Sequence, residues 1–214
     1  MKQAVAVVVV SACLLAATGC APKLVTYPAG AFQPIEQLPQ RQVDSPAYTA
    51  SVGALWNAID ASLTCYETDM RPVINGLHHA IEKVDHDALD ELVADGLRKN
   101  DKCFLLLLDE EHALKNFRAI NATARDPQLM NKGERVGIAA EALFQHVRVW
   151  IIQGRRVLED GYAYNRSWRE KNLSHLNAKN ETSFNDSAKR AHKQEQTVRE
   201  AGDALASAMH DLFT

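Results

Sequence analysis

The feature that most constrains this chain is the spacing of its large apolar side chains, which recur every three or four residues. The clearest stripe consists of Val52, Trp56, Ile59, Leu63, Tyr66 and Met70. A helix with 3.6 residues per turn places such positions on one face, whereas a half-buried strand needs apolar residues at every second position. No stretch of the sequence alternates convincingly with a period of two. The sequence therefore predicts an all-α fold.

Two helices with a break between them are expected in the first half of this pattern. Ser45 is a good N-cap and Pro46 suits a first helical turn, so we expect the first helix to begin there and to end before Pro72. The next stripe slips by one residue at Val84-Asp85-His86-Asp87, which is about 100° around a helix. This slip predicts a break at Asp85, where an aspartate can cap a new helix.

The second half of the chain predicts further helices separated by loops. An apolar segment covers residues 102–124, and "DPQLMNKGE" interrupts it with Asn131 and Glu134 at the spacing of a capping box. A long helix is expected from there to about Asp160. It is followed by a bend at "GYAYNRSW", a short helix near Leu173, a loop at "NAKNETSFND" and a C-terminal helix over 198–212. We expect an irregular helical bundle of five to seven helices.

The first residues have the pattern of an export signal. Lys2 is the only charged residue before Cys20, the stretch from Ala4 to Ala17 is almost entirely apolar, and small residues follow it. A positive start and an apolar stretch too short to span a membrane are typical of a cleaved signal peptide.

The end of this signal, Ala17-Thr18-Gly19-Cys20, resembles the lipobox of bacterial lipoprotein precursors, although alanine stands at position 17 where leucine is usual. The resemblance implies cleavage before Cys20 and lipid on both its thiol and its new amino terminus. In Gram-negative lipoproteins an aspartate after the cysteine commonly retains the protein at the inner membrane. Because Ala21 stands there, the resemblance implies a lipid anchor in the outer membrane, facing the periplasm. The alternative is an ordinary secretory signal in which Cys20 is incidental.

A proline-rich tether is expected between this anchor and the helices. Four of the seven prolines fall between Ala21 and Asp44. Proline lacks an amide hydrogen and opposes helix formation, so this segment is predicted to be extended. The expected organisation is a signal peptide over residues 1–19, a lipidated cysteine and tether over 20–44, and a helical domain over 45–214.

The remaining cysteines predict a disulfide between Cys65 and Cys103. Cys13 would leave with the signal and Cys20 would carry lipid, so these two thiols would be left in an oxidising compartment. One straight helix over residues 72–99 would carry the chain about 40 Å away, whereas a disulfide needs Cα atoms within about 7 Å. A break at Asp85 would return Cys103 to the level of Cys65. The alternative is a pair of buried, unpaired thiols.

Charge is unevenly distributed along the chain. Residues Asp60 to Glu111 include 13 acidic and 5 basic side chains, whereas His146 to Glu200 include 7 acidic and 11 basic ones. Two solvated helix faces that attract each other would explain this asymmetry. The alternative is an acidic patch for a basic partner, with Asp87, Asp90 and Glu91 as candidates. The whole chain has 24 basic and 27 acidic residues, which argues against nucleic-acid binding.

The sequence gives no support for an enzyme. It contains no G-x-S-x-G, Walker, HExxH or CxxC motif, and no glutamate has a histidine three residues later. His78, Glu82 and His86 would share one side of an unbroken helix and could ligate zinc. The phase slip falls between the last two, so we interpret them as surface residues. We expect no catalytic residues, no metal site and no cofactor.

These patterns together predict a binding protein of the cell envelope. The preferred interpretation is a non-enzymatic outer-membrane lipoprotein whose periplasmic domain binds an unidentified envelope protein, as an accessory or assembly factor. The alternative is an immunity or exclusion lipoprotein that neutralises a toxin or an incoming component. The expected partners are the lipid bilayer, through acylated Cys20, and that envelope protein.

Overall fold

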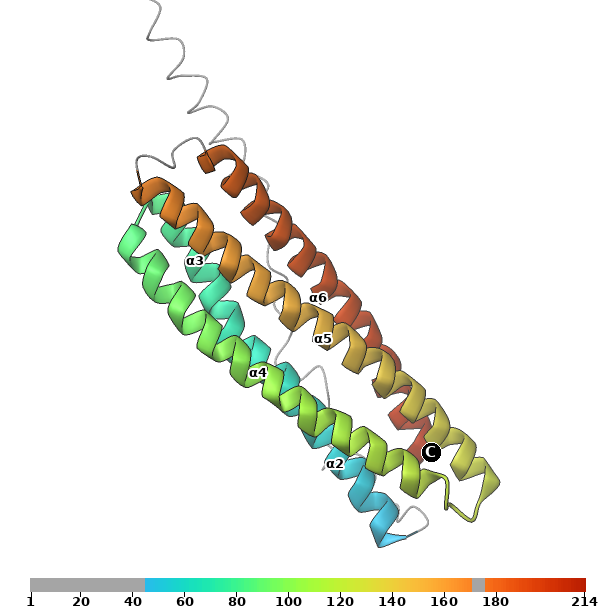
Figure 1. Ribbon diagram of the computed structural model, residues 1–214. Coiled ribbons are helices and arrows are strands. Elements are labelled where there is room, and N and C mark those ends of the chain that lie inside the picture. Colours follow the sequence, from blue (N-terminus) through green and yellow to red (C-terminus); the bar gives the residue numbers. More distant parts are fainter. Residues whose placement is uncertain (1–44, 171–175) are drawn as a thin grey trace, which may run out of the picture. The chain divides into compact units, whose positions relative to one another are not determined.

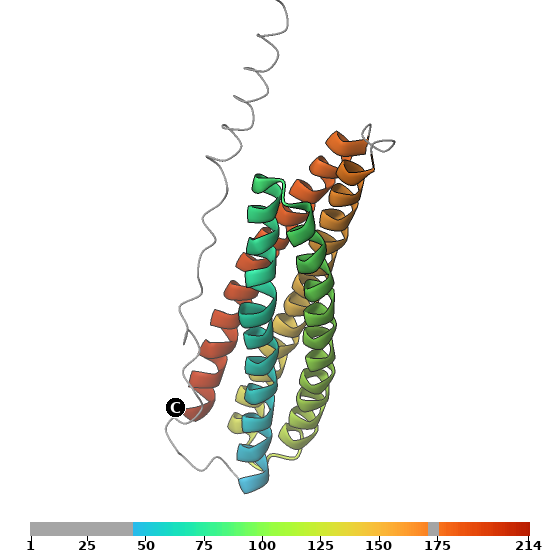
Figure 2. The same cartoon turned by 90° about the vertical axis from the view of Figure 1, so that its left-hand side faces the viewer.

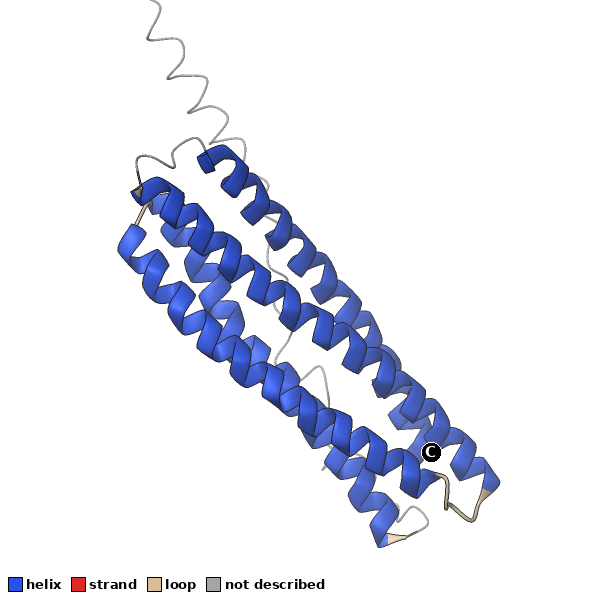
Figure 3. Cartoon of the chain, viewed as in Figure 1, coloured by secondary structure: helices blue, strands red, loops and turns tan. Residues whose placement is uncertain are grey.

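The described part of the chain is a bundle of α-helices. A computed structural model describes residues 45–170 and 176–214, within which there is no strand. The elements are α2 (Pro46–Cys65), η2 (Tyr66–Met70), α3 (Arg71–Lys83), α4 (His86–Asn121), α5 (Pro127–Arg169) and α6 (Asn177–Phe213), lying side by side (Figures 1 and 3). The all-α prediction is confirmed. The signal, lipobox and tether over 1–44 and the short helix expected near Leu173 lie outside the described residues.

Four helical rods form the described bundle, which is fewer than the five to seven expected, because η2 joins α2 to α3 and because α4 is continuous from His86 to Asn121. The helix begins as predicted: Ser45 Oγ accepts a hydrogen bond from the Tyr48 amide at 3.2 Å. The predicted stop at Pro72 is wrong. At η2 the backbone widens into a π-turn, in which the Arg71 amide bonds to the Tyr66 carbonyl five residues earlier. Pro72 falls in the first turn after this change of hydrogen bonding, where a missing amide hydrogen is tolerated.

The predicted break at Asp85 is confirmed, and with it the return of the chain along the first rod. α3 ends at Lys83, and α4 runs back beside α2 (Figure 2). The Cys65–Cys103 disulfide joins these two helices, with the Cα atoms 5.6 Å apart. The predicted disulfide is therefore confirmed, together with the break at Asp85 that brings Cys103 back to the level of Cys65.

The loop and capping box predicted around residues 126–134 are wrong. Asp126 caps α5 instead, with its Oδ1 accepting from the Gln128 amide at 2.8 Å, and Pro127 occupies the first turn. Asn131 and Glu134 are exposed residues within the first two turns of that helix. An aspartate followed directly by proline was a stronger start signal than the capping-box spacing.

The predicted bend after Asp160 and the loop at "NAKNETSFND" are also wrong. α5 continues to Arg169, and α6 already begins at Asn177. Gly161 is buried inside α5, and a Cβ there would lie 3.6 Å from the Phe184 ring of α6, which is an ordinary van der Waals distance. The helix continues through this glycine because it is packed against α6 at this level.

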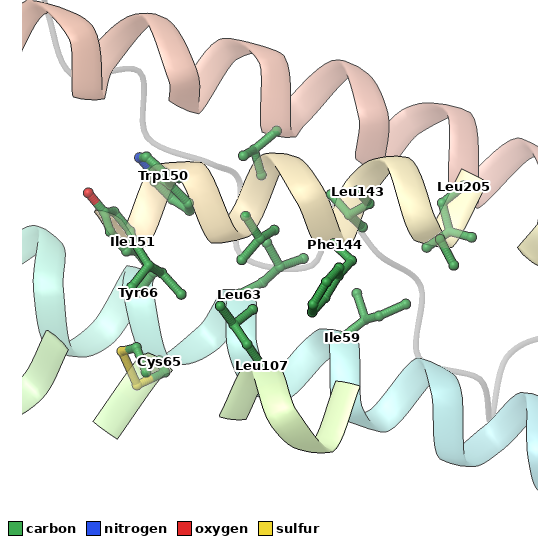
Figure 4. Packing of buried hydrophobic residues seen from close by; sticks show 14 of the residues in the cluster. Ile59, Leu63, Cys65, Tyr66, Leu107, Leu143, Phe144, Trp150, Ile151 and Leu205 are labelled. Atoms are coloured by element: carbon green, nitrogen blue, oxygen red, sulfur yellow. A yellow bond between two sulfur atoms is a disulfide. The ribbon is translucent and has the colours of Figure 1, made fainter. Parts of the chain in front are cut away.

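One apolar core runs through the bundle. Tyr66 and Trp150 stack across it with ring centroids 3.5 Å apart (Figure 4). The core continues along the bundle from this pair with side chains of α2, α4 and α5, among them Ile59, Leu63, Leu107, Leu143, Phe144 and Ile151. The disulfide lies at the edge of the same cluster, so it anchors the point at which α2 passes into the π-turn.

Candidate functional site

The α3–α4 turn carries the acidic residues that the sequence singled out, and its backbone is strained. Val84 has a left-handed conformation, with φ of 54°. Its amide bonds to the Ile81 carbonyl, and the Asp85 amide bonds to the Ala80 carbonyl, which is the Schellman arrangement. Glycine normally occupies this position, because a β-branched residue there costs on the order of 1–3 kcal/mol. The Val84 side chain is 57% exposed, so packing against the core does not offset this cost.

A buried asparagine of α5 holds the start of α4 in place. The Asn165 amide nitrogen donates to the His86 carbonyl at 2.9 Å and to Asp90 Oδ1 at 2.8 Å. Its Oδ1 lies 2.6 Å from His86 Nδ1. Since Asn165 is fully buried, these bonds replace all of its contact with water. The position of the acidic turn relative to α5 is therefore well defined.

The three predicted acidic residues lie together, and a cation that the sequence reading did not anticipate lies among them. Arg169 of α5 forms ion pairs with Asp87 and with Asp90, the latter at 3.3 Å. Glu91 is exposed and has no ion pair with any residue that the structure describes. Asp90 therefore has a structural role, Asp87 is partly neutralised, and Glu91 is the carboxylate most available to a partner.

The residues of the possible zinc site do not converge. His78 packs on the Phe184 ring at 5.2 Å, and burial lowers the pKa of its imidazole. His86 lies beyond the break and contacts Asn165 through Nδ1. Glu82 is exposed, and its Oε2 lies 3.9 Å from His79 Nδ1. Within residues 45–170 and 176–214, no group of three or more histidine, cysteine, aspartate or glutamate side chains could hold a metal ion.

Exposed aromatic side chains lie on α5 close to Arg169. Trp168 is 46% exposed and meets Tyr164 edge to face, with the ring centroids 6.2 Å apart. Tyr162 is 50% exposed. Aromatic residues are enriched where proteins meet partners, because they bury a large area at a low cost in conformational entropy.

A buried ionic cluster beside the π-turn was missed from the sequence. Arg71 pairs with Glu67 at 2.8 Å and with Glu195 of α6 at 2.6 Å. Burial raises the pKa of Glu67, and Arg71 opposes that shift. Glu195 occupies a core position between Ala191 and Val198 at helical spacing, which is the signal that could have marked it.

A second buried carboxyl, Glu110, lies between α2 and α4. It is 1% exposed, and its Oε2 lies 2.7 Å from the Ser62 hydroxyl. Its Oε1 has no hydrogen-bond partner among the described residues. Burial raises the pKa of Glu110 to about 7. Its position between Leu107 and Leu114, on the apolar face of α4, could have revealed it.

The described helices are not long and apolar enough for any of them to cross a membrane. Comparison with protein-family models, with characterised proteins and with solved structures finds no match for this chain.

Proposed function

We propose that this chain is a non-enzymatic lipoprotein of the outer membrane, anchored through Cys20, whose helical domain binds another envelope protein at the α3–α4 turn. The observation that carries the proposal is the conformation of Val84. An exposed apolar residue is held in a left-handed conformation that glycine would adopt without strain. Strained residues of this kind concentrate at binding and switching sites.

The surroundings of Val84 support a protein partner. The α4 side of the turn carries Asp87 and Glu91, and on α5 the exposed Trp168 directly precedes Arg169, which pairs with Asp87. An exposed apolar side chain, an aromatic ring and carboxylates are the elements of an interface with an apolar centre and a charged rim. The partner surface would be apolar with basic residues around it.

The anchor rests on the sequence from Ala17 to Cys20, which resembles a lipobox. Several acyl chains on one cysteine make release from the bilayer negligible, since each buried CH₂ contributes about 0.8 kcal/mol. A protein held in this way needs no membrane-spanning helix of its own. Its work would be to position or assist a partner in the envelope.

The test is photo-cross-linking in intact cells from position 84 of the full chain, followed by identification of the linked protein. Glu91→Lys should reduce that product strongly, because it reverses a rim charge that has no structural role in the fold. Asp203→Lys is the matched control, since Asp203 is an exposed carboxylate on α6. Reversal at Asp90 is unsuitable because Asp90 bonds to buried Asn165. A product unaffected by Glu91→Lys, or no product at all, would contradict the proposal.

The acidic side of the turn also favours the second function, an immunity or exclusion protein whose target is basic. The two functions differ in what deletion of the gene does. An immunity protein protects its cell, so deletion should be harmful only in the presence of the toxin or the competing donor. An accessory protein should instead leave an envelope defect in a pure culture.

A further inference from the structure

The contact between α2 and α4, here called the α2–α4 seam, contains one covalent bond and two hydrogen bonds between side chains. They join Cys65 to Cys103, Ser62 to Glu110 at 2.7 Å, and Tyr48 to Asn121 at 2.9 Å. Because the two helices are antiparallel neighbours, these bonds follow one another from the disulfide toward the start of α2 (Figure 2). Of the three, the middle bond is the one that contains a carboxyl group.

The hydrogen bonds around Glu110 are complete only when this carboxyl carries a proton. Ser62 Oγ lies within hydrogen-bond distance of both Glu110 Oε2 and the Ile59 carbonyl oxygen. A protonated Glu110 can donate to Ser62, which leaves the Ser62 hydrogen for Ile59. An ionised Glu110 can only accept that one hydrogen, and its Oε1 has no partner among the described residues. A buried carboxylate with so few partners destabilises the contact that contains it.

No charged side chain of the described residues pairs with Glu110. Burial raises its pKa, and the Ser62 hydroxyl opposes that rise. The titratable side chains in the neighbouring turns reach the surface, namely Asp60 of α2, Asp109, Glu111 and His112 of α4, and Arg148 of α5. Beyond the disulfide, Glu67 and Asp69 of η2 pair with Arg71 and Lys102. The remaining titratable residues of α3 lie over 78–83, next to the α3–α4 turn.

The first part of α2 is attached to the bundle chiefly through this seam. α2 is the first described helix and packs mainly on α4, whereas α5 packs on both α4 and α6. The disulfide fixes the end of α2 at Cys65. Separation of residues 46–62 from α4 would therefore stop at the disulfide and leave the packing of α5 on α6 in place.

We propose that Glu110 is a proton-operated latch on the α2–α4 seam. With its proton, Glu110 closes the seam through Ser62. When the proton is released to solvent, the carboxylate favours states in which residues 46–62 of α2 separate transiently from α4 and water reaches Glu110. The disulfide limits this opening to one end of the bundle.

This inference does not depend on the proposed function. Glu110 lies on α4 more than five turns from the α3–α4 turn, so the latch can fail while Val84 and Glu91 still bind a partner. Conversely, loss of cross-linking from position 84 would say nothing about the seam.

The experiment is amide hydrogen exchange of the purified full chain between pH 5 and pH 8, with each rate corrected for the intrinsic effect of pH on exchange. The open state has the ordinary pKa of 4.5, whereas the closed state has a pKa of about 7. The opening equilibrium of residues 46–62 should therefore rise on the order of 50-fold over this range and level off near its upper end. It should also exceed, by tenfold or more, that of the slowest amides of α5 and α6, which report unfolding of the whole bundle.

Glu110→Gln should abolish this rise, because its amide cannot ionise. Glu111→Gln is the matched control and should keep the rise. Ser62→Ala should move the levelling-off to higher pH, because it removes the hydroxyl that lowers the pKa of Glu110. Circular dichroism verifies that each variant is folded.

Two results would overturn the latch. One is a rise that persists in Glu110→Gln or is missing from the wild type. The other is exchange of residues 46–62 that is as slow as that of the slowest amides of α5 and α6, because α2 would then open only when the whole bundle unfolds.

Discussion

Glu110 should make the stability of this protein depend on pH in a way that glutamine at the same position removes. The Ser62 hydroxyl lies 2.9 Å from the Ile59 carbonyl oxygen and 2.7 Å from Glu110 Oε2. One hydroxyl hydrogen cannot serve both acceptors at once. When Glu110 is protonated, its own O–H donates to Ser62 Oγ and the Ser62 hydrogen donates to Ile59. When Glu110 is ionised, one of these acceptors loses its donor.

The size of the effect follows from burial of this carboxyl. Burial raises the pKa of Glu110 from 4.5 to about 7 in the folded protein, and the unfolded chain keeps the ordinary value. The folded state therefore binds more protons between these pH values, and the free energy of unfolding falls as pH rises through them. The loss is at most about 1.4 kcal/mol per pH unit, or on the order of 3 kcal/mol from pH 4.5 to above pH 7.

Denaturant unfolding of wild type and Glu110→Gln at pH 5, 6, 7 and 8 measures this loss. The amide of glutamine can donate to Ser62 Oγ as the protonated acid does, so the two proteins should be similar at pH 5. At pH 8 the variant should be more stable by roughly 2–3 kcal/mol. Glu111→Gln is the control, because Lys115 lowers the pKa of that exposed carboxyl and it should not titrate in this range. A difference between wild type and Glu110→Gln that stays constant from pH 5 to pH 8 would refute the reasoning.

Four further outcomes are expected. Val84→Gly should raise the free energy of unfolding by about 1 kcal/mol, seen as a melting temperature higher by roughly 3 °C, because it relieves the left-handed conformation; a lower melting temperature would contradict this. Replacing Cys65 and Cys103 with serine should cost roughly 3–4 kcal/mol in denaturant unfolding, from a cross-link that spans 38 residues; wild type should show no free thiol when unfolded without reductant. Gly133→Ala should destabilise by roughly 1–3 kcal/mol, since the new Cβ would overlap the side chains of Asn121 and Tyr48; an unchanged melting curve would contradict the packing. Cys20→Ser should abolish labelling with a palmitate analogue and outer-membrane fractionation, and a label that survives the substitution would end the lipoprotein proposal.

Helical periodicity predicted the class of fold and the course of the first rods, but not where the later helices end. The slip in phase at Asp85 was informative because one residue moves a side chain about 100° around a helix. Pro72 misled because the free-energy cost of proline in a helix depends on the backbone hydrogen bonds of the preceding turn. The π-turn over Tyr66–Met70 had already changed those hydrogen bonds. Gly161 misled because it lies inside α5, facing Phe184 of α6, where packing between the two helices keeps α5 continuous. Helix propensity is a local property of the sequence, whereas the points at which these helices end or continue depend on tertiary packing.

The sequence predicted that the three acidic residues lie near one another, but it did not predict their ion pairs. The run of acidic residues after the break located Asp87, Asp90 and Glu91 on one surface. That Arg169 would pair with two of them depended on the length of α5, which the sequence reading ended too early. The buried polar residues could only be suspected from their core spacing, because their partners come from other helices. Glu195, for example, meets Arg71, which lies 124 residues earlier in the chain.

The disulfide also determines how a pulling force would travel through this protein. Tension applied at Ser45 and at the C-terminus would pass along α2 to Cys65, cross the covalent bond to Cys103, and continue through the second half of α4. The chain between the two cysteines, which contains α3 and the strained turn at Val84, would carry none of that load. A domain pulled by its ends could therefore lose α6 and still present the α3–α4 turn, whereas loss of α5 would remove the Asn165 and Arg169 contacts that hold the turn in place. Reduction of the bond would place that turn directly in line with the force.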